Sequence, residues 1–272
     1  MEENNLFKIG ITHGDFNGIG YEIIMKALAD NKILELCTPV VYGIGKVAAA
    51  YKKGLDLGDF SMQVIKNIQQ ANNKKANLLN ISDEEVTLTM GEENSVAGKM
   101  AVLALNVACK DLQDKQIDAM VTAPVNANVM PFPFPGHAKY LADKLKLQDG
   151  LQMMIAEPLK LAFVTDRLPI EKVGEVLSKD LIIAKLKMLD ESLQKDFRCT
   201  NPKIAVLALN KPSGDGGKFG KTEQEIIKPA IEEAFAAKIN SFGPFAADDF
   251  FASEEYLKFD AVLVMCQEQG MM

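Results

Sequence analysis

Short apolar runs rich in β-branched residues alternate along the chain with longer segments whose apolar residues recur at helical spacing. Runs such as AVLAL and AVLVM are apolar at every position, which is typical of strands covered on both faces. The pattern predicts strands at residues 6–12, 39–42, 63–66, 85–90, 118–122, 152–156, 161–165, 204–209 and 261–265. Such alternation predicts an α/β protein with a largely parallel sheet.

Amphipathic helices are predicted between these strands. In residues 179–197, the side chains of Ile182, Leu186 and Leu189 fall on one stripe, and residues 95–112 show the same spacing. A further helix is predicted from Thr222, where Thr-Glu-Gln-Glu gives a capping-box signal and Pro229 predicts a kink or a boundary. We interpret these stripes as core-facing surfaces without a direct functional role.

Composition and charge narrow the classes of function. The 272 residues include 30 Lys and Arg against 37 Asp and Glu, a net charge of −7, and this acidic balance without a basic run argues against a nucleic-acid partner. No signal peptide or apolar stretch of about 18 residues is present, so we expect a cytoplasmic protein without a membrane partner. The four cysteines form no CxxC pair, and the chain has only two histidines, His13 and His137.

Glycine-rich or polar loops are the candidate sites for chemistry, and most of them follow predicted strands. Residues 11–20 (ITHGDFNGIG) precede a helix near Tyr21, where glycines and a helix N-terminus favour an anion, although, taken alone, the loop is explained somewhat better by a tight structural turn. We interpret His13 in this loop as a structural or surface histidine. Thr122 and Asn126, in VTAPVN, have side chains able to donate to a ligand, although a simple Pro-initiated turn is the favoured interpretation of this segment taken alone.

Two later loops complete the set. In FPGH, His137 opens the predicted helix 138–147, where the helix dipole favours a neutral imidazole that binds a ligand or serves only as a cap. Residues 209–217 (LNKPSGDGG) carry Asn210, Asp215 and three glycines, which suits a ligand-binding nest as well as a flexible loop. Together, the four loops favour a single ligand cleft over four unrelated turns.

The motifs ITHGDFNGIGYE, VTAPVN, FPGH, LALN with SGDGG, GPFAAD and DAVLVMCQEQG occur here in one order. Between about residue 7 and the last residues, the chain thereby resembles the family of 4-hydroxythreonine-4-phosphate dehydrogenase, the NAD-dependent enzyme of pyridoxal-phosphate biosynthesis. The resemblance implies an isocitrate/isopropylmalate dehydrogenase-like fold, in which two α/β domains with an interleaved chain surround a central cleft. It also implies a homodimer, and a family sequence that continues beyond Gly270, so that a C-terminal part is missing here.

The resemblance also implies the site residues. The substrate-binding positions are Thr122, His137, Asn210 and Asp215, together with Ala138 where the family has threonine. Asp248 is retained as well, and Ala127 replaces a family lysine.

In the family, three histidines hold a divalent metal; the corresponding residues here are Arg167, Pro212 and Gln267. Arginine stays protonated and proline has no side-chain donor atom, so we expect no metal site. The missing C-terminal part supplies much of the family's NAD site, so we do not expect complete NAD binding either.

Three hypotheses follow. The chain is an active family dehydrogenase, a non-catalytic binder of a small phosphorylated or anionic metabolite, or a truncated gene product. The loss of the metal histidines argues against the first. The retained glycine loops and His137 favour the second, in which the fixed charge of Arg167 neutralises an anion directly. The abrupt C-terminus favours the third.

Overall fold

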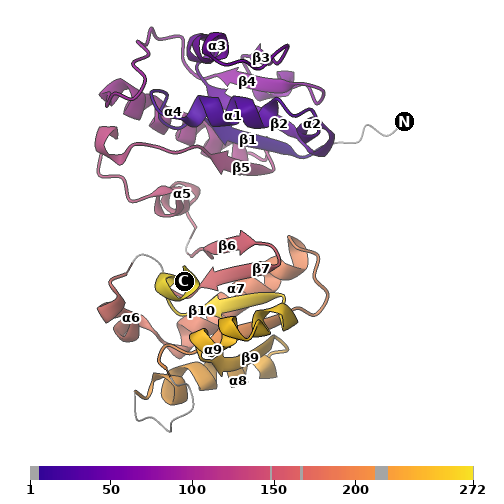
Figure 1. Ribbon diagram of the computed structural model, residues 1–272, viewed down its shortest axis with the longest axis vertical. Helices are drawn as coiled ribbons and strands as arrows, with labels where there is room; N and C mark the ends of the chain where they lie inside the picture. Colours follow the sequence, from indigo (N-terminus) through magenta and orange to yellow (C-terminus); the bar gives the residue numbers. More distant parts are fainter. Residues whose placement is uncertain (1–5, 148, 166–167, 212–219, 272) are drawn as a thin grey trace. The chain divides into compact units, whose positions relative to one another are not determined.

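The computed structural model describes residues 6–147, 149–165, 168–211 and 220–271. Its contacts divide the chain into two compact units, unit 1 (Met1–Gln148) and unit 2 (Asp149–Met272). Each unit has its own sheet and its own core (Figure 1). The division falls at one point of the chain, between residues 148 and 149.

Unit 1 contains a five-stranded sheet in the order β3-β4-β2-β1-β5, in which every neighbouring pair is parallel. Its strands are β1 (Lys8–Thr12), β2 (Thr38–Gly43), β3 (Met62–Ile65), β4 (Ala76–Asn80) and β5 (Ala119–Thr122). Its helices are α1 (Gly20–Leu28), α2 (Ile33–Leu36), α3 (Gly45–Gly54), α4 (Ser95–Gln113) and α5 (His137–Leu145), with 3-10 turns η1 (Ile68–Gln70) and η2 (Ala127–Val129).

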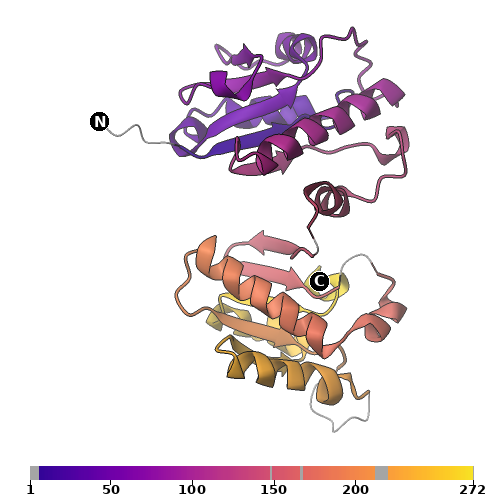
Figure 2. The same ribbon diagram turned by 180° about the vertical axis from the view of Figure 1, so that it is seen from behind.

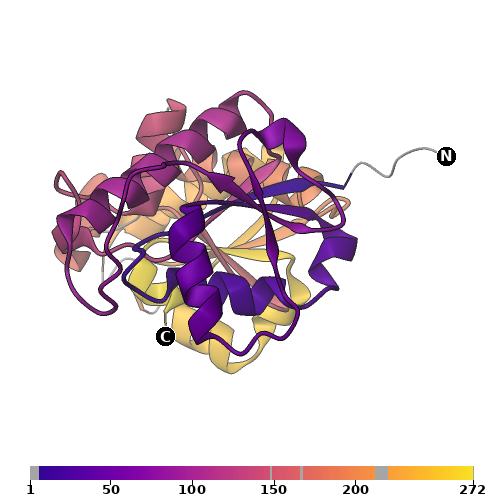
Figure 3. The same ribbon diagram turned by 90° about the horizontal axis from the view of Figure 1, so that it is seen from above.

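Helices cover both faces of this sheet. Leu78 packs with α1, α3 and the N-terminal part of α4 in one apolar cluster, whereas its neighbour Leu79 packs with the later turns of α4 in another. Successive residues of a strand point to opposite faces, so the later turns of α4 lie on the face opposite α1 and α3 (Figures 2 and 3). This double coverage explains why β2 is buried at every position and reads as an apolar run.

Unit 2 contains a five-stranded sheet in the order β6-β7-β10-β8-β9, parallel except for the antiparallel pair β6 and β7. Its strands are β6 (Met153–Ala156), β7 (Leu159–Phe163), β8 (Lys203–Leu207), β9 (Asn240–Phe245) and β10 (Ala261–Val264). Its helices are α6 (Ile170–Val176), α7 (Lys179–Lys195), α8 (Lys228–Ala236), α9 (Ala247–Ala252) and α10 (Gln267–Gly270), with the π-helical turn η3 (Glu223–Ile227) and the 3-10 turn η4 (Glu255–Lys258).

The two faces of this second sheet have different covers. One face packs against the aliphatic side of α7 and α8, and the other packs against aromatic residues of α9 and the loops around it (Figures 1 and 2). Phe250 is 2% exposed and its ring lies 5.1 Å from that of Phe245. In the described part of the chain, no helix is both long and apolar enough to cross a membrane.

The predicted α/β architecture with parallel strands is confirmed, but four features differ from the expectation. The expected strand at 85–90 is irregular, and the sequence analysis missed β4 and β9. The capping box expected at Thr222 does not form, because that side chain makes no cap hydrogen bond and the chain enters a π-helical turn instead. The helix then continues as α8 with Pro229 in its first turn, which fits the predicted boundary.

Candidate functional site

Two of the predicted loops meet in unit 1. β1 and β5 are parallel neighbours with Thr12 opposite Thr122, so their carboxyl ends lie at the same edge of the sheet. The backbone N–H of Asp15 donates to the carbonyl of Pro124 at 2.9 Å, which joins the loop after β1 to the loop after β5. Gly14 makes this approach possible, because its φ is +72° and a Cβ atom there would overlap the Pro124 carbonyl.

His13 lies inside the core of unit 1 and not on its surface. Its side chain is fully buried, and its ring stacks on that of Tyr21 at 5.3 Å. Burial lowers the pKa of His13 to about 4, and the nearby Met100 backbone opposes this shift only in part. The imidazole is therefore neutral at neutral pH and inaccessible to a ligand, as expected of a structural histidine.

Asn17 organises the irregular segment that the sequence analysis assigned to a strand. Its Oδ1 accepts from the backbone N–H of Thr89 at 3.0 Å, and its Nδ2 donates to the carbonyl of Glu92 at 3.2 Å. The Gly91 N–H donates to the Asn17 carbonyl at 2.8 Å. Asn17 is buried, and its side-chain amide forms hydrogen bonds to this segment, which stabilise the loop after β1. Nothing in the local sequence pattern points to this contact.

Thr122 and Asn126 have different surroundings. Thr122 is half-buried and lines an apolar groove of ≈ 380 Å³ in unit 1, which Ile11 and Val121 also line. Asn126 accepts from the Asn128 backbone N–H at 3.0 Å and donates its amide to Glu93 Oε1 at 3.1 Å. Asn126 therefore stabilises its own turn, which supports the simple turn interpretation of that residue.

Glu93 receives the amides of both turn asparagines. Asn128 Nδ2 donates to Glu93 Oε1 at 2.9 Å, slightly closer than the amide of Asn126. These two hydrogen bonds, from Asn128 first and Asn126 second, lower the pKa of the Glu93 carboxyl. The turn after β5 is thus tied to the segment that precedes α4.

His137 and Ala138 occupy the first turn of α5. His137 is the first residue of that helix and lies edge-on to the ring of Phe134 at 5.4 Å, whereas Ala138 is exposed. The helix is anchored by Tyr140, which is buried and donates its hydroxyl to Asn106 Oδ1 of α4 at 2.8 Å. The predicted helix is confirmed, and the packing of Tyr140 sets the position of His137.

In unit 2, polar side chains cross-link the carboxyl ends of three parallel strands. After β7, Thr165 Oγ1 donates to the Met265 carbonyl beyond β10 at 2.8 Å. Gln269 Oε1 accepts from the Met265 N–H at 2.9 Å, and its Nε2 donates to the Ala208 carbonyl beyond β8 at 2.6 Å. These bonds are buried, so they hold the strand ends in a defined arrangement.

A pocket of ≈ 350 Å³ lies at this edge of unit 2. Its lining residues are Ile170, Leu209, Asn210, Cys266, Glu268 and Gln269. Ligands of open α/β sheets bind beyond the carboxyl ends of strands, so this pocket, here called the strand-end pocket, is the candidate binding site of unit 2. Of the predicted site residues, Asn210 lines it, and Asp215 lies outside the described residues together with Arg167 and Pro212.

The residues present do not match a three-histidine metal site. Within the described ranges, no group of three or more His, Cys, Asp or Glu side chains is arranged to hold a metal ion. Of the three positions expected to supply ligands, only Gln267 is described, and its amide oxygen is a poor ligand for a transition metal. Asp248, which the resemblance also implied, forms an ion pair with Lys211.

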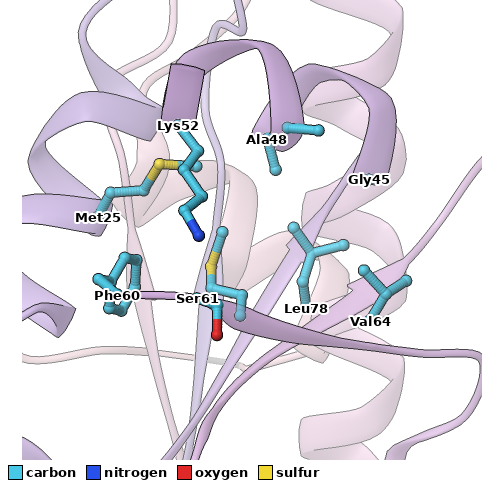
Figure 4. Close-up of a pocket in the computed structure, with 10 residues that line it drawn as sticks. Met25, Gly45, Ala48, Lys52, Phe60, Ser61, Val64 and Leu78 are labelled. Atoms are coloured by element: carbon cyan, nitrogen blue, oxygen red, sulfur yellow. The ribbon is translucent and has the colours of Figure 1, made fainter. Parts of the chain in front are cut away.

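A further pocket of unit 1 contains none of the predicted site residues. It has a volume of ≈ 230 Å³, lies beside α3, and is lined mainly by apolar side chains such as Met25, Val64 and Leu78 (Figure 4). The Lys52 amine and the Ser61 hydroxyl are its polar groups (Figure 4). It is therefore separate from the candidate residues found at the strand ends.

The largely parallel sheets, covered by helices, define the class: an α/β protein. Solved structures support this class. A 4-hydroxythreonine-4-phosphate dehydrogenase from Burkholderia phymatum matches 98% of this chain and 82% of its own with a TM-score of 0.85 and 27% identity. The same enzyme from Klebsiella pneumoniae matches 97% and 83% with a TM-score of 0.84 and 26% identity.

Sequence comparisons give the family. The model for the "Pyridoxal phosphate biosynthetic protein PdxA" family matches residues 35–272. A 4-hydroxythreonine-4-phosphate dehydrogenase of Bacteroides thetaiotaomicron is 39% identical over 275 residues, which cover 100% of this chain and 75% of the relative. One of Sulfurihydrogenibium is 32% identical over 272 residues, covering 98% and 82%. The chain belongs to the PdxA family of pyridoxal-phosphate biosynthesis, as the sequence motifs indicated.

Proposed function

We propose that this chain binds a small phosphorylated hydroxy or amino acid of the 4-hydroxythreonine 4-phosphate class and does not catalyse the metal-assisted oxidation of that substrate. The relatives' names supply the substrate class. The histidine content argues against the metal-assisted oxidation. A chain with two histidines has no set of three to offer a metal ion.

The burial of His13 carries this proposal. That imidazole is fully buried against Tyr21 and is inaccessible to a ligand or metal, and His137 is the only other histidine in the sequence. Arg167 and Pro212, at two of the expected ligand positions, have no lone pair to give to a cation. The residues therefore do not fit the family's metal, and no reaction step is assigned to it.

The features that favour binding are retained. Gly14 allows the loops after β1 and β5 to adjoin, and His137 opens a helix whose N-terminal N–H groups favour an anion. In unit 2, Asn210 lines the strand-end pocket. Arg167 supplies a fixed positive charge that suits a phosphate or carboxylate group. This chain therefore binds the substrate class without the Lewis-acid chemistry of a bound metal.

Two assays test the two halves of the proposal. In the first assay, the protein is mixed with 4-hydroxythreonine 4-phosphate, NAD and a divalent metal, and the absorbance of NADH is expected to stay constant. Steady NADH production would overturn the claim that oxidation is lost. Thermal denaturation is expected to shift upward with the same phosphate ester in the absence of metal. No shift with the ester or with related phosphorylated hydroxy acids would overturn the claim of binding.

A matched pair of variants in α5 identifies the site. His137→Asn removes the imidazole at the first helical residue and is expected to abolish most of the ligand-induced shift. Asp143→Asn changes an exposed residue two turns later in the same helix and is expected to keep it. Equal shifts in both variants would mean that the ligand does not contact His137.

A further inference from the structure

Glu223 of unit 2 is a buried carboxylate that the sequence analysis assigned to a helix start. It is 6% exposed, and its side chain reaches the loop after β8. Its Oε1 accepts from the Asn210 backbone N–H at 2.7 Å, and both of its oxygens accept from Asn210 Nδ2 at 3.3 Å. Its neighbour Glu225 is exposed and pairs with Lys221 at 3.6 Å, so only Glu223 is turned inward.

A buried carboxylate at this place is costly for stability. Transfer of a charged group out of water is unfavourable unless a cation or several hydrogen bonds offset it. Among the described residues, the polar partner of Glu223 is Asn210, and none of the ion pairs includes Glu223. An apolar residue would fill this part of the core as well, so burial alone does not account for a carboxylate that is hydrogen-bonded to Asn210.

The backbone around the pair is adapted to it. Glu223 begins the π-helical turn Glu223–Ile227, a distortion that occurs often at functional sites. Gly220 has φ of +132°, and a Cβ atom there would lie 3.1 Å from Asn210 Nδ2, closer than side chains normally pack. A glycine thus leaves room for the amide of Asn210 beside the carboxylate.

The chemistry of the pair determines which end of the Asn210 amide is available. A carboxylate accepts hydrogen bonds and donates none, so the NH₂ group of Asn210 must face Glu223. The oxygen Oδ1 is then the end left for a ligand in the strand-end pocket, which Asn210 lines. The amide of Gln269, in the same pocket, is already used by Met265 and Ala208.

The remaining polar groups of the pocket agree with this direction. Glu268 lines the pocket with an exposed carboxylate, which is another acceptor. The described lining contains no Lys or Arg. A ligand group that donates hydrogen bonds, an alcohol or an ammonium, therefore suits this pocket better than a phosphate does.

We propose that Glu223 is a positioning residue that fixes Asn210 Oδ1 as the acceptor for the hydroxyl or ammonium group of the bound ligand. The identity of the ligand rests on the proposed function, whereas the orientation of the amide does not. The proposal places the hydrogen-bond donor end of the ligand at Asn210 in the strand-end pocket.

The first test is spectroscopic and needs no ligand. The side-chain NH₂ signals of Asn210, assigned by their loss in Asn210→Asp, are expected to be shifted and slowly exchanging in the wild-type protein. Glu223→Gln is expected to move them and to speed their exchange, whereas the control Glu225→Gln leaves them in place. Unchanged Asn210 signals in Glu223→Gln would overturn the proposal.

The second test measures affinity by calorimetry with two probes, 4-phosphoerythronate and O-phosphohomoserine. 4-Phosphoerythronate carries hydroxyls and no ammonium, whereas O-phosphohomoserine carries an ammonium and no free hydroxyl. The probe that binds more tightly therefore identifies which group donates a hydrogen bond to Asn210. Glu223→Gln is expected to weaken that probe about tenfold, the equivalent of one lost hydrogen bond, and Glu225→Gln to leave it unchanged.

A swapped pair separates positioning from folding. In Glu223→Gln with Asn210→Asp, the glutamine donates and the aspartate accepts, so an acceptor oxygen again faces the pocket. This double variant is expected to bind more tightly than either single variant. Wild-type affinity in Glu223→Gln, or no recovery in the swap, would overturn the proposal. If the wild-type protein binds neither probe, the proposed function fails, and the NH₂ signals alone decide the role of Glu223.

Discussion

Replacement of Gln269 by leucine tests whether one amide holds the strand ends of unit 2 together. Gln269 is 9% exposed and bonds both to the Met265 N–H and to the Ala208 carbonyl. Met265 is 0% and Ala208 1% exposed, so water has no access to replace the amide. Leucine is close in size and removes only the hydrogen bonds.

The expected loss follows from these two groups. Each buried donor or acceptor left without a partner costs about 1–3 kcal/mol, or about 4 kcal/mol for the pair. Greater burial of apolar surface by leucine offsets roughly 1 kcal/mol of this. Gln269→Leu should therefore lower the free energy of unfolding of unit 2 by about 3 kcal/mol, which corresponds to a fall of about 10 °C in Tm for a domain of this size.

Thermal and urea denaturation followed by far-UV circular dichroism measure this loss, and hydrogen exchange at the Met265 amide locates it. The control is Gln267→Leu, a half-buried position on the same short helix. The control should stay within about 0.5 kcal/mol of the wild-type protein. The reasoning is wrong if Gln269→Leu is as stable as the control, or if the Met265 amide exchanges no faster than in the wild-type protein.

Three further predictions concern burial and backbone. Burial lowers the pKa of His13 from 6.5 to about 4, so as the pH falls the unfolded chain binds the proton before the folded chain does. The free energy of unfolding therefore keeps the full contribution of the neutral ring above about pH 6.5 and falls by about 3 kcal/mol by about pH 4. His13→Phe should flatten that part of the curve of stability against pH, and an equally steep curve would contradict this. Gly14→Ala should lower the stability of unit 1 by more than about 1 kcal/mol in urea denaturation, because the φ of Gly14 is +72° and the Pro124 carbonyl blocks a Cβ atom. The control is Gly58→Ala, since Gly58 also has a positive φ but nothing lies within 4 Å of its Cβ position, so the difference between the two variants measures the clash. Phe250→Ala should cost about 3–5 kcal/mol in unit 2, since its buried ring fills the aromatic cluster, and a loss below 1 kcal/mol by calorimetry would argue against that packing.

The elements that sequence patterns predicted well are those whose burial is uniform. β2, β8 and β10 are buried at nearly every position because helices cover both faces of each sheet, so their sequences are continuous apolar runs. The helices α4 and α7 were predicted almost to their ends, since each buries one stripe. Local pattern and global fold agree at these places.

The missed strands are those in which tertiary contacts compensate for unfavourable residues. β4 contains Asn77, a residue typical of turns, whose buried amide donates to the Pro39, Asn72 and Lys75 carbonyls. β9 contains a glycine and a proline, which an edge strand tolerates at the irregularity beside β8. The segment 85–90 alternates like a strand, yet Asn17 holds it in an irregular form.

The sequence by itself determined the α/β class, the family and the scarcity of histidine, because each depends on residue identity or on local periodicity. Only the tertiary structure decided that His13 is buried and inaccessible to a ligand, that Glu223 accepts hydrogen bonds from Asn210, and that Gln269 joins two strand ends. Each of these contacts joins groups that local pattern does not relate, 61 residues apart for Gln269 and Ala208. The geometry that directs a side chain to its partner exists only once the sheet has formed.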